Sequence, residues 1–88
     1  KQALARFYEL APDQFTLGCG SDNVLALLAQ TFVKPGGDIL IPEYSFATFS
    51  IIANANHASP RIIPTLNWQV DIDALIKAVT TNTQLVFI

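Results

Sequence analysis

Residues 38–42 constrain the fold more than any other part of the chain. Ile39, Leu40 and Ile41 are apolar on consecutive positions, whereas a strand with one face in water alternates apolar and polar residues. We therefore expect a strand that is covered on both faces, which is typical of the parallel sheets of α/β proteins. Gly36-Gly37 before the segment and Pro42 at its end are turn-forming residues that support these limits.

Helical and strand patterns alternate along the rest of the chain. Apolar spacing and breakers predict helices over residues 1–10, 21–32, 44–56 and 71–79, and further strands over residues 15–17, 60–64 and 84–88. Ser21 and Asp71 are expected to cap the second and fourth helices. Prolines at both ends of 60–64 suit a strand near a sheet edge. Helical crossovers require parallel pairing, so the predicted fold class is α/β, with alternating helices and mainly parallel strands.

Composition excludes several classes of protein. An apolar fraction of 51% with 14% charged residues excludes a disordered chain. A net charge of −2 offers no basic field for nucleic acid, and no apolar run approaches the roughly 20 residues that span a bilayer. One histidine and one cysteine cannot form a cluster of soft metal ligands. The high apolar content in 88 residues leads us to expect a single partial domain over residues 1–88, a fragment that pairs with a second copy or belongs to a longer protein.

Residues 18–23, Gly-Cys-Gly-Ser-Asp-Asn, form the first candidate site. Glycines let the backbone approach an anion closely, and the free N–H groups of a helix start point toward it. A tight turn with a serine cap explains the same residues equally well. The segment also partly matches a dinucleotide-binding fingerprint, although Asn23 stands where a third glycine is expected. Glu43 is only an imperfect match to the acidic residue that the fingerprint places further along the chain.

Tyr44 is the second candidate, because it follows the strand 38–42 at the edge where parallel α/β sheets bind ligands. Its ring could stack on a flat cofactor, or it could cover the sheet edge. Trp68 falls in a connecting segment, where we expect it to pack against the protein.

The order of these motifs resembles that of the large domain of class I/II aminotransferases, which are pyridoxal-phosphate enzymes of fold type I. Within that family, the chain is most similar to the histidinol-phosphate aminotransferases. The resemblance covers nearly the whole chain and is carried by Gly20-Ser21-Asp22-Asn23, Pro35-Gly36-Gly37-Asp38, Pro42-Glu43-Tyr44 and the segment 64–71.

The resemblance implies that pyridoxal 5′-phosphate is the cofactor. Ser21, Asp22 and Asn23 would lie at its phosphate, and Tyr44 would stack on its pyridine ring. No residue of this chain takes a catalytic role, because the family's Schiff-base lysine, ring-nitrogen aspartate and substrate arginine all come later in the sequence. The implied reaction is transfer of an amino group from a small-molecule donor, histidinol phosphate in histidine biosynthesis, to a 2-oxo acid.

The same resemblance implies a cytoplasmic protein that forms a homodimer or a swapped assembly, and a segment that is inactive alone. Two other interpretations remain open from the residues themselves. One is a Rossmann-like nucleotide-binding fragment, which depends on the imperfect glycine turn. The other is a non-catalytic α/β interaction module whose apolar excess is a partner surface.

Overall fold

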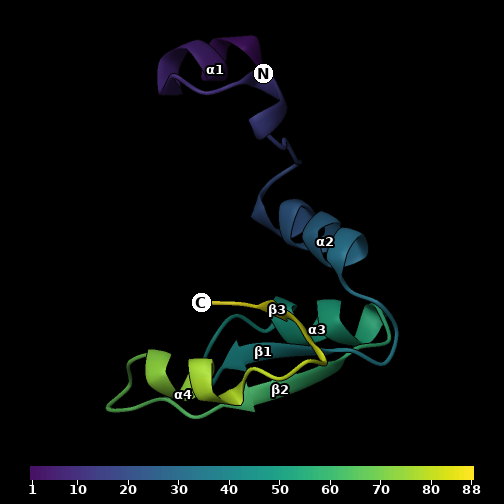
Figure 1. The fold of residues 1–88 in the computed structure, drawn as a ribbon, viewed down its shortest axis with the longest axis vertical. Coiled ribbons are helices and arrows are strands. Elements are labelled where there is room, and N and C mark those ends of the chain that lie inside the picture. The colour runs from purple at the N-terminus through teal and green to yellow at the C-terminus, as the bar shows by residue number, and fades with distance from the viewer.

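Three parallel strands form the centre of the fold in a computed structural model that describes all of residues 1–88. These strands are β1 (Asp38–Pro42), β2 (Ser59–Ile63) and β3 (Thr83–Val86), and their order across the sheet is β2-β1-β3 (Figure 1). Both neighbours of β1 run parallel to it. The predicted α/β class with a parallel sheet is therefore confirmed.

The central strand β1 is buried along its whole length, as its unbroken apolar run predicts. Ile39 and Ile41 belong to the larger of two buried clusters, whereas Leu40 belongs to the smaller. Since successive side chains of a strand point to opposite faces, the two clusters lie on opposite faces of the sheet. β2 lies at the edge, as expected, and there Pro60, which has no N–H to donate, pairs with Ile39.

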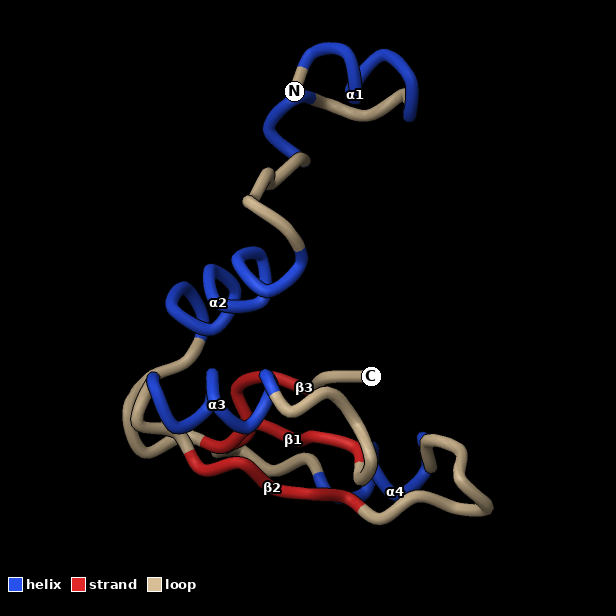
Figure 2. The backbone as a smooth tube through the Cα atoms, turned by 180° about the vertical axis from the view of Figure 1, so that it is seen from behind, coloured by secondary structure: helices blue, strands red, loops and turns tan.

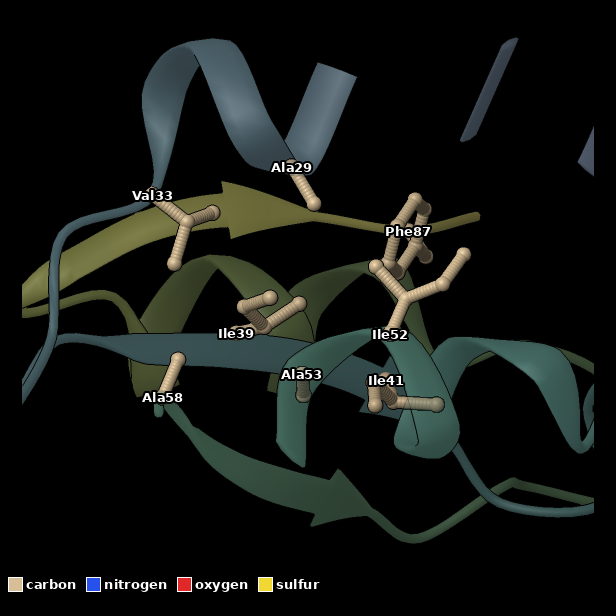
Figure 3. Close-up of a cluster of buried hydrophobic side chains, with 8 residues drawn as sticks. All are labelled: Ala29, Val33, Ile39, Ile41, Ile52, Ala53, Ala58 and Phe87. Carbon is tan, nitrogen blue, oxygen red and sulfur yellow. The ribbon is translucent and has the colours of Figure 1, made fainter. Parts of the chain in front are cut away.

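Helices cover the two faces unequally. α2 (Ser21–Phe32) and α3 (Thr48–Ala55) contribute to the larger cluster, which Figure 3 shows between these helices, β1 and the end of the chain. The ring of Phe49 stacks on that of Phe87, with 4.1 Å between centroids. α4 (Ile72–Ala78) covers the other face through Leu75. Asp71 caps α4 as predicted, because its Oδ1 accepts a 2.9 Å hydrogen bond from the N–H of Ala74.

Arg61 joins two strands through an ion pair and reaches α4 through a hydrogen bond. Arg61 on β2 donates from Nη1 to Oδ2 of Asp38 on β1 at 3.2 Å, and to the carbonyl of Ala78 at 3.0 Å. Asp38 is only 6% exposed, and its second oxygen, Oδ1, has no hydrogen-bond partner. A buried carboxylate is costly without a counter-charge, so Arg61 is what makes this position tolerable for an aspartate.

The N-terminal part of the chain projects away from the sheet (Figures 1 and 2). α1 (Gln2–Tyr8) contacts mainly the short 3-10 helix η1 (Pro12–Gln14). This arm explains a radius of gyration of 14.9 Å, compared with about 12 Å expected for a compact chain of this length. No helix is long and apolar enough to cross a membrane.

Only 15 of the 88 residues are buried, so much of the apolar content lies on the surface. The exposed apolar side chains include Phe7 on α1, Phe32 on α2 and Trp68 after β2. Globular domains of this size bury most of such groups. The expectation that this chain cannot bury its apolar residues by itself agrees with these exposures.

Three local predictions were wrong. Residues 15–17 form no strand, because none of the three strands lies beside them to accept pairing. The third helix begins at Thr48 rather than at Tyr44, whose φ of 57° is incompatible with a right-handed helix. Ser21 is the first residue of α2 and not its cap; Gly20 holds the cap position and no side chain bonds to the helix start there.

Candidate functional site

The glycine turn before α2 has a backbone shape that only glycine adopts easily. Gly20 has φ 82° and ψ 171°, a region that is essentially restricted to glycine. A Cβ on Gly18 would lie 2.7 Å from Cγ2 of Val24 and 2.9 Å from Oδ1 of Asn23, both closer than van der Waals contact. The two glycines thus allow the chain to pass tightly over the start of α2.

Asn23 holds this turn together. Its Oδ1 accepts a 3.0 Å hydrogen bond from the N–H of Cys19, which draws the turn against the first turn of the helix. Ser21, Asp22 and Asn23 are all exposed, and their backbone N–H groups have no acceptor in the chain. Three free donors at a helix start, where the helix dipole is positive, form an arrangement that binds anions.

The side chains of the turn differ in what they can offer an anion. The hydroxyl of Ser21 makes no hydrogen bond within the chain, so it is free to donate to a ligand. The carboxylate of Asp22 can only accept and would repel a phosphate, so this residue can contribute only through its backbone N–H. The tight-turn alternative stands without its serine cap, because Ser21 lies inside the helix and no side chain caps it.

Tyr44 lies two residues after the end of β1 and is 71% exposed. Two hydrogen bonds brace the loop that carries it against the loop after β2. The N–H of Glu43 donates to the carbonyl of Ile63 at 2.8 Å, and the N–H of Thr65 donates to Oε2 of Glu43 at 3.2 Å. This exposure leaves the ring of Tyr44 accessible to a ligand.

Trp68 is the residue whose role the sequence did not reveal. The expectation that it packs against the protein is met only by one ring contact, since Trp68 is 83% exposed. Its indole instead lies against the ring of Tyr44, with 4.8 Å between centroids and 32° between planes. The order Asn67-Trp68 between Leu66 and Gln69 contains no glycine to mark a hairpin turn, so the contact could not be read from the pattern.

The glycine turn and Tyr44 lie toward the same end of the layered structure. α2 runs opposite to β1, so its first turn lies toward the carboxyl ends of the strands, where Tyr44 follows β1 (Figure 1). No hydrogen bond joins the two loops. Neither of the two surface hollows is lined by Ser21 or Tyr44, so both residues are presented on an open surface.

The whole chain, residues 1–88, matches the family model described as aminotransferase class I and II. The chain belongs to this family. It is 42% identical over all 88 residues to histidinol-phosphate aminotransferase 1 of Caulobacter vibrioides, and 39% identical to the protein of the same name from Mannheimia succiniciproducens. Each alignment covers 24% of the relative, so the chain spans about a quarter of the length of these aminotransferases.

Solved aminotransferases share the fold. Histidinol-phosphate aminotransferase from Sinorhizobium meliloti, solved in complex with pyridoxal-5′-phosphate, superposes with a TM-score of 0.83 and 23% identity. That match covers 92% of this chain and 22% of the solved one. The resemblance drawn from the short motifs around Gly20, Pro35 and Pro42 is therefore confirmed at the level of the family, and the chain corresponds to part of the large domain.

Proposed function

We propose that this chain is the N-terminal part of the cofactor-binding large domain of a pyridoxal-phosphate-dependent aminotransferase. The reaction we propose is transfer of the amino group of histidinol phosphate to 2-oxoglutarate, a step of histidine biosynthesis. The observation that carries the proposal is identity of up to 42% with histidinol-phosphate aminotransferases across the full length of the chain. These alignments cover residues 1–88, so the glycine turn and Tyr44 both fall within them.

The residues present fit the phosphate of this cofactor. A phosphate dianion needs several hydrogen-bond donors, and the start of α2 offers three unpaired N–H groups and the hydroxyl of Ser21. In this proposal Ser21 donates from both its side chain and its backbone, and Asp22 donates from its backbone. Asn23 adds its own N–H and, through Cys19, keeps the turn in the shape that aims these donors.

Tyr44 fits the aromatic ring of the cofactor. Its exposed phenol ring stands on a loop that is braced to its neighbour by two hydrogen bonds, so a ring stacked on it is held in one plane. Pyridoxal phosphate, when bound, supplies the electron sink that amino-group transfer requires. The chain's own contribution is to anchor and orient, not to move protons.

None of the three lysines fits a catalytic role. Lys34 follows the carboxyl end of α2, the end opposite the glycine turn, and Lys77 lies in the last turn of α4. Lys1 precedes the projecting helix α1. We therefore propose that residues 1–88 have no activity alone. For the full protein we propose a cytoplasmic homodimer.

Spectroscopy and turnover of the full-length protein test this function together. We expect a visible-region absorption band of bound cofactor that borohydride abolishes, and transamination that is faster with histidinol phosphate than with other amino donors. Residues 1–88 alone serve as the control and should show no turnover. Binding of NAD without pyridoxal phosphate would instead support the nucleotide-binding alternative, and strong association without any small-molecule binding would support the interaction module.

A further inference from the structure

The turn that carries Trp68 has an unusual residue for its shape. Leu66 and Gln69 exchange two backbone hydrogen bonds of 2.9 and 3.0 Å, which closes a two-residue hairpin. The two residues between them both have positive φ, 51° at Asn67 and 63° at Trp68. Such turns favour asparagine followed by glycine. Asn67 fits this preference, whereas a tryptophan occupies the position where glycine is favoured.

No burial of Trp68 in this chain offsets the unfavourable positive φ of this residue. Left-handed backbone is unfavourable for a bulky residue, and burial does not compensate because the indole is mostly exposed. Its one aromatic contact is with Tyr44, which itself has a φ of 57°. Two aromatic residues in strained conformations thus face each other at the same site, and such strain is concentrated at functional positions.

The loops that carry Tyr44 and Trp68 are also joined to each other. The two hydrogen bonds through Glu43, to Ile63 and from Thr65, join the loop of Tyr44 to the segment that leads into the turn of Trp68. These bonds hold together the two loops that carry the rings. A ring has two faces, and the large exposure of Tyr44 leaves the face away from Trp68 open.

We propose that Trp68 is a positioning residue that covers one face of Tyr44 and fixes its ring plane, so that the opposite face receives the flat ring of the cofactor. This inference rests on the proposed function, because the cofactor is the ligand whose ring Tyr44 would hold. Trp68 itself does not contact the cofactor. It acts through Tyr44, and losing it should change how tightly and in which orientation the cofactor is held.

Three variants of the full-length protein test the proposal. Trp68→Gly removes the indole and supplies the residue that the turn favours, Trp68→Phe keeps a ring, and Asn67→Gly relaxes the same turn while keeping the indole. The measurements are the dissociation constant of pyridoxal phosphate, the circular dichroism of the bound cofactor in its own absorption band, and the melting temperature without cofactor.

We expect Trp68→Gly to raise the dissociation constant by about two- to tenfold, as loss of one aromatic contact predicts. It should also reduce the cofactor's circular dichroism, while the melting temperature without cofactor stays within a few degrees of wild type, since relief of the turn offsets the lost contact. Trp68→Phe should restore most of both cofactor signals, and Asn67→Gly should leave them unchanged.

Several results would overturn the inference. An unchanged dissociation constant in Trp68→Gly, or an equal change in Asn67→Gly, would show that the indole does not position Tyr44. A large fall in the melting temperature of cofactor-free Trp68→Gly would show that the indole serves the fold. If the wild-type protein binds no pyridoxal phosphate, the proposed function falls and this inference with it, whereas binding that ignores Trp68 rejects the inference alone.

Discussion

Replacing Gly20 by alanine should weaken cofactor binding more than it weakens the fold, and Gly36 provides a matched control. Both glycines have positive φ, 82° at Gly20 and 84° at Gly36, and at both a new Cβ would meet nothing within 4 Å. The two alanine variants therefore introduce backbone strain without a steric clash. They differ in place, since Gly20 precedes the start of α2 and Gly36 lies in the loop before β1.

The structure sets the expected magnitudes. Strained backbone of this kind costs about 1–3 kcal/mol, so both variants should lose that much free energy of unfolding. At Gly20 the relaxation of the strain also moves the N–H groups of Ser21 and Asp22, which would donate to the phosphate. Losing one charge-assisted hydrogen bond costs about 1.5–3 kcal/mol, which corresponds to a roughly ten- to hundredfold higher dissociation constant for pyridoxal phosphate.

The assay is titration of each full-length variant with pyridoxal phosphate, combined with urea unfolding in the absence of cofactor. Unfolding should show a loss of about 1–3 kcal/mol in each variant, whereas titration should separate their dissociation constants by an order of magnitude or more. Equal dissociation constants for Gly20→Ala and Gly36→Ala would show that the backbone at Gly20 does not shape the phosphate site.

Two further predictions concern the free energy of unfolding of the full-length protein, measured with urea. Leu40→Ala should cost about 2–5 kcal/mol, because Leu40 is fully buried against Ile63 and Leu75. The control variant Leu40→Ile should cost less than about 1.5 kcal/mol. Similar losses in the two variants would contradict this packing. Arg61→Ala should cost roughly 1–3 kcal/mol because it leaves the carboxylate of Asp38 buried and unpaired, and a neutral effect would show that water reaches that carboxylate.

The sequence predicted the elements whose signal is local. The apolar run of β1 has no polar interruption, so its burial on both faces followed directly. Asp71 stands before a regular apolar stripe, so its cap on α4 followed as well. The expected strand at residues 15–17 failed because a strand also needs a neighbour, and the alternation of Phe15 and Leu17 carries no information about which strands lie nearby.

At the candidate site, the sequence indicated which residue types could bind a ligand, but it did not predict their backbone conformation. The glycines and Ser21 indicated an anion site from the sequence, but the bond from Cys19 to Asn23 that shapes the turn appears only in three dimensions. The contact between Tyr44 and Trp68 depends on positive φ at both residues. Aromatic residues rarely adopt that conformation, so no propensity could have predicted it.

A crystal structure of the full-length protein with pyridoxal phosphate would show directly whether the glycine turn and Tyr44 hold one cofactor molecule. We expect its phosphate to accept hydrogen bonds from the backbone at Ser21 and Asp22, and its ring to stack on Tyr44. A cofactor that touches only one of these two loops, or a Tyr44 ring turned away from it, would show that the two loops do not form one cofactor site.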